Sequence, residues 1–302
     1  EARTKQILEQ FYQKTQGEIT RSFLSRMITR LESEQSVKEY LDIMDHRKTE
    51  QLIDTLDKVE QNRKECYIRE FSIEHFHDSK VFETLIPKIC KIFREENEEL
   101  TGFENEEILA EYQIYKTPGY VYMKGNVQIY SAGKQAADIS AFPEGIAVAV
   151  GSEEDVPDIC PDQTIDKVFT IENLTSFYRF KQEHSLVIYL GGYHNRSRRN
   201  LLMQIYQKLP DAQYYHFGDL DAGGFYILEH LKRKTGIPFQ MFQMDIETLK
   251  KYEDYAKPLT ENDKKRLMQL EKMELPDEER KLITYMLQKG IKLEQECISE
   301  SQ

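Results

Sequence analysis

The sequence predicts an α/β protein whose main domain is a parallel β-sheet with helices on both faces. From residue 167 onward, short apolar runs alternate with amphipathic helical stretches, the order typical of βαβ units. The connections between these runs are short, and crossovers of this kind place helices on both faces of a parallel sheet. Before residue 166 the pattern changes twice, which divides the chain into regions 1–75, 76–165 and 166–302.

The first region, residues 1–75, reads as helices followed by a strand. Apolar residues recur at helical spacing in residues 7–12, 19–31 and 49–59, and residues 66–73 then alternate like a strand. Helices followed by a strand are typical of a winged-helix unit. A small helical scaffold without DNA contact is the alternative interpretation.

The second region, residues 76–165, is predicted to be a connector and a small β-rich unit. Residues 120–123 and 127–130 are strand-like and flank Lys124-Gly125-Asn126, which indicates a β-hairpin. Residues 142–150 form a further apolar run, and the acidic, proline-containing residues 151–166 read as a linker.

The third region, residues 166–302, carries the βαβ pattern and then becomes helical. Its predicted strands are residues 168–171, 186–190, 214–217 and 239–244, and its predicted helices are residues 174–182, 197–209 and 225–234.

Composition excludes several classes of protein. No apolar run approaches the length of about 20 residues that a membrane helix needs. The first residues are not a secretory signal, and the four cysteines are far apart, which favours a cytoplasmic protein without disulfides or a zinc site. The formal net charge of −12 argues against a general nucleic-acid coat protein. It is compatible with a nuclease that carries a local basic surface.

Three acidic residues follow predicted strands of the third region. Glu172 follows the first strand, and Asp219 and Asp221 follow the third, ahead of Gly223-Gly224. Carboxyl ends of parallel strands meet at one edge of a sheet, where α/β proteins place their sites. Carboxylates held together repel one another, and Mg²⁺ or Mn²⁺ would relieve this repulsion. Helix capping is the simpler interpretation of Asp221 alone or of Glu172 alone.

These motifs resemble a known family. Residues 167–244 are similar to a Toprim domain, a Rossmann-like module, and Ile171-Glu172-Asn173, Gly191-Gly192 and Gly218-Asp219-Leu220-Asp221 resemble the JetD branch of it, from Wadjet anti-plasmid systems. Arg69-Glu70-Phe71, Asp78 to Glu83 and Leu293 to Glu296 extend the resemblance over about residues 65–300. The chain lacks an initiator Met, so we expect it to be a trimmed or shorter form.

The resemblance implies a Mg²⁺- or Mn²⁺-dependent endonuclease that cuts circular double-stranded DNA. Glu172, Asp219 and Asp221 would bind the metal, or Glu172 would act as general base. Independently of the resemblance, Glu294 or Glu296 is a candidate ligand of a second metal or a candidate partner of the first ligands. The implied partners are DNA, an SMC-like motor complex with kleisin subunits, and a second copy of the chain.

A basic cluster follows the second strand of this region. Arg196, Arg198 and Arg199 lie at the predicted start of a helix, where cations oppose the helix dipole. A phosphate partner explains the cluster better than an exposed helix start does, because guanidinium groups match phosphate geometry.

Three other functions are compatible with parts of the pattern. A topoisomerase VI A-like subunit needs a tyrosine nucleophile, for which Tyr12, Tyr40 and Tyr67 are candidates by location only. A dehalogenase-type phosphatase would carry Asp-x-Asp after its first strand, which is not the case here. A non-catalytic Toprim adaptor of an SMC complex is the third alternative.

Overall fold

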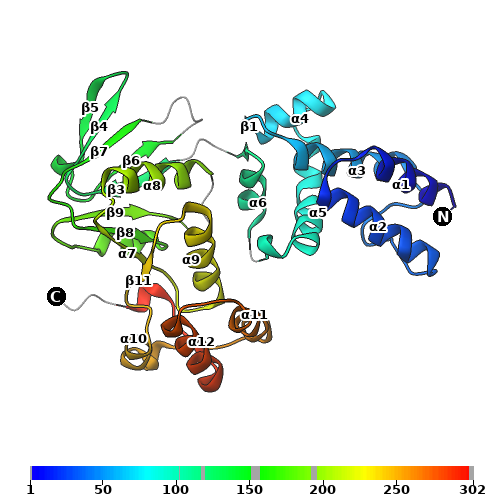
Figure 1. Cartoon of the computed structure of the whole chain (residues 1–302). Coiled ribbons are helices and arrows are strands. Elements are labelled where there is room, and N and C mark those ends of the chain that lie inside the picture. The colour runs from blue at the N-terminus through cyan, green and yellow to red at the C-terminus, as the bar shows by residue number, and fades with distance from the viewer. Residues whose placement is uncertain (1, 102, 117–119, 151–156, 192–195, 299–302) are drawn as a thin grey trace. The chain divides into compact units, whose positions relative to one another are not determined.

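The chain divides into two compact units, Glu1–Thr117 and Pro118–Gln302. The computed structural model describes residues 2–101, 103–116, 120–150, 157–191 and 196–298, and the side chain of Arg196 lies outside this description (Figure 1). The division into regions 1–75, 76–165 and 166–302 stays a prediction.

Unit 1 is mainly helical. Its elements are α1 (Ala2–Lys14), α2 (Glu18–Glu32), α3 (His46–Gln61), β1 (Cys66–Tyr67), α4 (Ile68–Phe76), α5 (Val81–Glu96), the 3₁₀ turn η1 (Glu98–Leu100), α6 (Asn105–Glu111) and β2 (Ile114–Tyr115). The three predicted helices of residues 7–12, 19–31 and 49–59 are confirmed as parts of α1, α2 and α3.

The strand predicted over residues 66–73 is wrong beyond Tyr67. Glu70 accepts a hydrogen bond of 2.8 Å from the Tyr67 N–H, which caps the first turn of α4. Ile68, Phe71 and Ser72 are the buried residues of α4, and this helical spacing overrides the apparent alternation. In the described part of unit 1, β1 and β2 pair in parallel. They do not make the antiparallel hairpin of a wing, so the winged-helix assignment stays a prediction.

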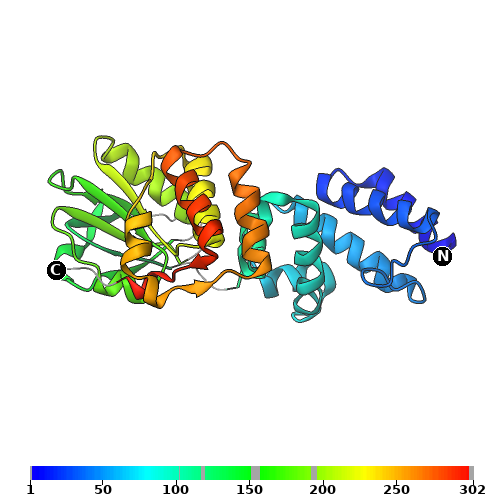
Figure 2. The ribbon, with the colours of Figure 1, turned by 90° about the horizontal axis from the view of Figure 1, so that it is seen from below.

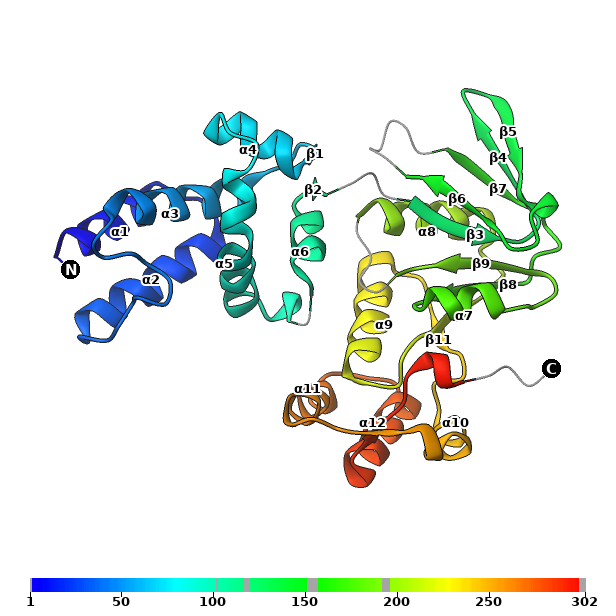
Figure 3. The same ribbon diagram turned by 180° about the vertical axis from the view of Figure 1, so that it is seen from behind.

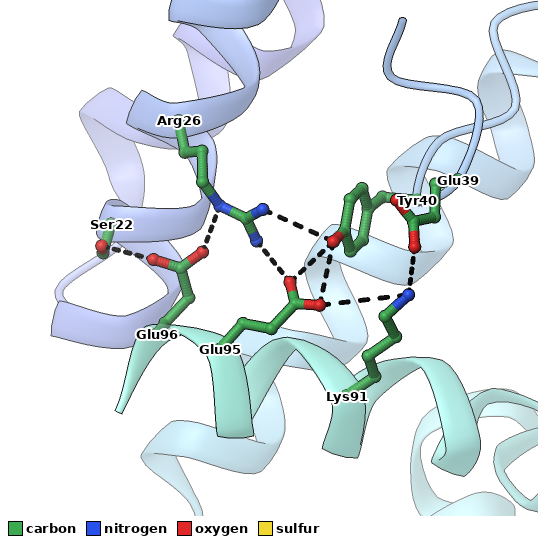
Figure 4. A network of polar contacts seen from close by, with 7 residues as sticks. All are labelled: Ser22, Arg26, Glu39, Tyr40, Lys91, Glu95 and Glu96. Carbon is green, nitrogen blue, oxygen red and sulfur yellow. Dashed lines mark hydrogen bonds and ion pairs between the residues drawn. The ribbon is translucent and has the colours of Figure 1, made fainter. Parts of the chain in front are cut away.

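A network of charged side chains joins α2, α5 and the segment between α2 and α3 (Figure 4). Arg26 of α2 donates to Glu96 at 2.6 Å and to Glu95 at 2.9 Å. The hydroxyl of Tyr40 donates to Glu95 at 2.7 Å. Lys91 pairs with Glu39, and Ser22 donates to Glu96. Because the network links segments about 70 residues apart in sequence, it stabilises the packing of unit 1.

Unit 2 contains a six-stranded mixed sheet among its described residues (Figure 3). Its strands, in spatial order, are β11 (Gln240–Met241), β10 (Gln213–Phe217), β8 (Lys167–Ile171), β9 (Ser185–Tyr189), β3 (Tyr120–Lys124) and β6 (Ile146–Ala149). The four strands from β11 to β9 are parallel, which confirms the predicted βαβ core. β3 and β6 add antiparallel strands at one edge. The sheet is therefore mixed, whereas a purely parallel sheet was predicted.

The predicted hairpin of residues 120–130 is wrong in its pairing. Both strands exist, but β3 pairs with β6 and β9 in the large sheet. β4 (Val127–Ser131) lies between β5 (Lys134–Asp138) and β7 (Asp158–Pro161) in a separate three-stranded sheet. β7 also occupies part of the predicted linker, whose residues 151–156 lie outside the described residues. Alternation predicts that a strand exists, whereas its partner depends on packing with distant residues.

Helices cover both faces of the large sheet, as predicted. The remaining elements are η2 (Ile139–Ala141), α7 (Leu174–Arg179), α8 (Arg196–Lys208), α9 (Ala222–Thr235), α10 (Ile246–Lys251), η3 (Glu253–Tyr255), β12 (Lys257–Pro258), α11 (Glu261–Glu271), α12 (Asp277–Lys289), β13 (Ile291–Lys292) and η4 (Gln295–Cys297). Tyr214 of β10 contacts Tyr206 of α8, with ring centroids 5.2 Å apart. The next residue, Tyr215, points to the opposite face and stacks on Phe169.

The C-terminal helices complete the hydrophobic core on the Phe169 face. Leu249, Leu267 and Leu282 from α10, α11 and α12 are buried with Phe169 and Phe217 in one cluster. Figure 2 shows α11 and α12 side by side near α9. In the residues that the structure describes, no helix is long and apolar enough to cross a membrane.

Candidate active site

The acidic residues lie where the strand order of the parallel core reverses. The chain runs from β8 to its neighbour β9, and then crosses to β10 on the other side of β8. Glu172 directly follows β8, and Asp219 follows β10 by one residue. The Glu172 N–H donates to the Phe217 carbonyl at 3.0 Å, so these two strand ends are hydrogen-bonded neighbours. The carboxyl end of such a switch point is the usual ligand site of α/β sheets.

Asp219 is partly buried among acidic groups. Its Oδ1 accepts a hydrogen bond of 2.7 Å from the backbone N–H of Gln295. Burial, together with the charges of Asp221, Glu296 and Glu294, raises the pKa of Asp219 to about 6 despite this hydrogen bond. A cation bound nearby would favour the charged form of this carboxylate.

Asp221 caps helix α9, which confirms the simpler interpretation of this residue. Its Oδ1 accepts a hydrogen bond of 2.8 Å from the Gly224 N–H. Gly224 is required here, because a Cβ at this position would lie 2.1 Å from the Asp219 carbonyl oxygen. Capping uses one carboxylate oxygen and leaves the second for another ligand. A cap and a metal ligand are therefore compatible roles.

Glu172 lies beside the backbone that leads into Asp219. The Asp219 N–H is 3.4 Å from Oε2 of Glu172, and Nε2 of His216 is 3.9 Å from the same oxygen. Only glycine fits at residue 218, because a Cβ there would lie 2.4 Å from Glu172 Oε2 and 2.9 Å from His216 Nε2. The structure therefore places Glu172, Gly218 and Asp219 in one contact region.

Two residues that the sequence did not single out support this region. Gln295 is fully buried, donates to the Phe217 carbonyl at 3.0 Å, and accepts from the Asn173 N–H at 2.9 Å. His216 is also fully buried, and burial lowers its pKa to about 3. The predicted neighbours of Gln295 have other contacts, because Glu294 pairs with Lys257 and Glu296 accepts from the Asn173 side chain. The resemblance pointed to the segment from Leu293 to Glu296, but the residue of this segment that contacts the strand ends is Gln295.

Two arginines of the predicted cluster, Arg198 and Arg199, have different neighbours. Arg198 donates to the Leu190 carbonyl at 2.7 Å, just past the end of β9, so it lies at the same sheet edge as Glu172. Arg199 is close enough to His230 of α9 to lower the pKa of that histidine. The side chain of Arg196 and residues 192–195 lie outside the described residues. Phosphate binding by the three arginines stays a prediction.

Metal binding also stays a prediction. In the described ranges of the chain, no group of three or more His, Cys, Asp or Glu side chains is arranged so that it could hold a metal ion. The donor chemistry nevertheless fits Mg²⁺ or Mn²⁺, because Glu172, Asp219 and Asp221 supply hard carboxylate oxygens. Burial first, and then the charges of neighbouring acids, raise the pKa of Asp219, and such a cation would offset both effects.

The candidate tyrosines of unit 1 differ in exposure. Tyr40 is 4% exposed, and its hydroxyl donates to Glu95 within the network of Figure 4. Tyr67 is 37% exposed at the start of α4, and Arg21 lies over the ring of Tyr12. The contacts of Tyr40 favour a structural role over that of a nucleophile.

Fold and site together define an α/β protein with carboxylates gathered at the switch point of a mixed sheet. Residues 154–302 match the family model described as Wadjet protein JetD, C-terminal. The chain is also 28% identical over 263 residues to a Wadjet protein JetD from Bacillus cereus (strain Q1), a match that covers 85% of this chain and 63% of that relative. The chain is therefore similar to JetD proteins over most of its length, and the match spans less than two thirds of the length of this relative.

Proposed function

We propose that the chain is the DNA-cleaving subunit of a Wadjet-type complex, a metal-dependent endonuclease that hydrolyses phosphodiester bonds of circular double-stranded DNA. The observation that carries this proposal is the position of Glu172 and Asp219 on adjacent strand ends at the switch point. The similarity to a protein named Wadjet protein JetD supports the assignment to such a system. The same arrangement is the reason for assigning residues 167–244 to the Toprim class.

In this proposal Glu172, Asp219 and Asp221 hold Mg²⁺ or Mn²⁺. When bound, this cation would supply Lewis-acid polarisation of a phosphate oxygen and a lower pKa for an attacking water. Glu172 either binds the cation or accepts the proton of that water. Gln295 fixes Asp219 through its backbone N–H, and the Gly224 N–H fixes Asp221. Arg198, held at the end of β9 by the Leu190 carbonyl, orients a phosphate.

The proposed partners are double-stranded DNA, an SMC-like motor complex with kleisin subunits, and a second copy of this chain. Cleavage of both strands requires two reactions, and a symmetric dimer supplies two sites. A net charge of −12 is unfavourable for DNA binding by the whole surface. Capture of DNA by the motor complex would compensate for this charge, so we expect cleavage to depend on the partners.

The test is cleavage of supercoiled plasmid by the full chain together with its operon partners, in Mg²⁺ or Mn²⁺. We expect linear DNA without attached protein. Glu172→Ala and Asp219→Ala should each reduce the cleavage rate on the order of 100-fold or more. Glu261→Ala is the control, because this exposed acid of α11 pairs with Lys264 and is not one of the candidate site residues, so its loss should leave cleavage unchanged.

Three other outcomes would contradict the proposal. Cleavage that survives both Glu172→Ala and Asp219→Ala would reject the site. DNA ends covalently attached to tyrosine would indicate a topoisomerase VI A-like subunit. A complex that retains plasmid with the wild-type chain but never cuts it would indicate a non-catalytic adaptor.

A further inference from the structure

We infer that His216 is a positioning residue for Glu172, to which it presents an Nε2–H group from within the sheet. His216 is fully buried in β10, and among the described residues its Nε2 has no hydrogen-bond partner. This nitrogen lies 3.9 Å from Glu172 Oε2. A buried polar atom without a partner costs free energy. The nearby Glu172 carboxylate is the acceptor that would remove this cost. The functional value of this contact rests on the proposed nuclease activity.

The strand register explains why these two side chains meet. His216 of β10 is paired with Thr170 of β8, and Glu172 lies two residues beyond Thr170. Side chains two apart on a strand share a face, so Thr170, Glu172 and His216 lie on the same side of the sheet. Oγ1 of Thr170 is 3.0 Å from Nδ1 of His216. The imidazole is therefore held between a hydroxyl on one side and a carboxylate on the other.

The surroundings select which ring nitrogen carries the proton. If Nδ1 carried it, the lone pair of Nε2 would face the negative charge of Glu172, which is repulsive. If Nε2 carries it, the single Thr170 hydroxyl hydrogen goes to Nδ1 at 3.0 Å in place of the more distant Tyr215 carbonyl at 3.3 Å, and the Nε2–H faces Glu172. Ligand-orienting partners of this kind fix the direction of a metal-binding side chain. Gly218 has no Cβ and therefore leaves space between Glu172 and His216. A small movement of the Glu172 carboxylate toward Nε2 then forms the hydrogen bond.

Nuclear magnetic resonance of the ¹⁵N-labelled histidines tests the contact without metal or DNA. The chain has seven histidines, and His230 is a buried control outside the site. We expect the Nε2–H tautomer for His216. We also expect Glu172→Gln to shift the His216 Nε2 signal and leave His230 unchanged. An Nδ1–H tautomer, or a His216 signal that does not respond to Glu172→Gln, would overturn the inference.

Matched substitutions then test whether the contact matters for metal binding. The amide nitrogen of His216→Gln replaces Nε2, whereas that of His216→Asn replaces Nδ1, and His216→Phe keeps only the ring. By calorimetry with Mn²⁺ we expect affinity about tenfold weaker for His216→Asn and His216→Phe, and restored by His216→Gln. Equal affinities in folded Asn, Phe and wild-type proteins would contradict the positioning role. A wild-type chain that binds no Mn²⁺ would instead reject the proposed metal site, and the metal-free spectra would still decide the contact.

Discussion

The backbone N–H of Gln295 donates a hydrogen bond of 2.7 Å to Oδ1 of Asp219, a residue 76 positions earlier in the chain. An antiparallel bridge between Leu220 and Leu293 holds the two segments together. The C-terminal segment therefore forms part of the candidate active site, because it supplies the donor that fixes a carboxylate. The site therefore depends on the central part of unit 2 and on its C-terminal segment.

Gln295→Leu should destabilise unit 2 and impair the site together. The substitution removes the side-chain acceptor of the Asn173 N–H and one of two donors to the Phe217 carbonyl, which keeps its hydrogen bond from the Glu172 N–H. An unpaired buried group costs about 1–3 kcal/mol, so we expect a loss of about 1–3 kcal/mol in unfolding free energy. Urea denaturation measures this loss. Glu294→Gln, an exposed change nearby, should alter stability by less than about 1 kcal/mol, and equal effects of the two variants would contradict the assigned role of Gln295.

Gly218→Ala should displace Glu172. A Cβ at residue 218 would lie 2.4 Å from Glu172 Oε2, so the carboxylate must move away from its position beside Asp219. Displacement of a catalytic group by about 1 Å costs on the order of 100-fold in rate, which plasmid cleavage with the partner proteins would measure. Gly236→Ala is the control, since its positive φ of +70° makes alanine strained there but no atom lies within 4 Å of the added Cβ. Gly236→Ala should lower stability and leave the cleavage rate unchanged. Equal cleavage rates for the two variants would show that Gly218→Ala does not displace Glu172.

Local periodicity accounts for the parts of the fold that the sequence predicted well. The strands that became β8, β9 and β10 were placed within one residue at each end, because their residues are buried on both faces and bounded by turn residues. The placement of Glu172 and Asp219 at one sheet edge then followed from the geometry of parallel strands alone.

Contacts between distant segments account for what could not be predicted. Nothing in residues 120–131 distinguishes a hairpin from two strands in separate sheets, because both have the same alternation. The roles of His216 and Gln295 arise from partners 46 and 76 residues away. Asp221 shows the opposite case, in which a short-range cap was recognisable from sequence and is confirmed.

Tyr40→Phe should reduce stability without affecting cleavage. The variant removes the hydroxyl that donates to Glu95, while Arg26 continues to pair with that carboxylate (Figure 4). The loss of one hydrogen bond to a charged group predicts a decrease of about 1–3 kcal/mol in unfolding free energy. Plasmid cleavage should stay at the wild-type rate. A stable Tyr40→Phe protein that cannot cut DNA would instead support a tyrosine nucleophile. Tyr67→Phe, which removes an exposed hydroxyl, is the control for the stability measurement.

Acid should destabilise unit 2 through His230. Burial lowers the pKa of His230 to about 3, and the charges of Arg199, Lys234 and Arg233 contribute in the same direction. The unfolded chain has the ordinary histidine pKa of about 6.5, so it binds more protons than the folded protein between these values. Stability from the neutral His230 is therefore complete above pH 6.5 and declines as pH falls, by up to about 1.4 kcal/mol per pH unit.

His230→Gln isolates this contribution, because other titrating groups are common to both proteins. Urea denaturation at pH 7, 6 and 5 should show a smaller loss of unfolding free energy for His230→Gln than for wild type, with the difference growing below pH 6.5. The two proteins need not be equally stable at pH 7, since the comparison uses the change with pH. Parallel pH dependences would mean that His230 becomes protonated in the folded state as readily as in the unfolded chain, contrary to its burial in α9.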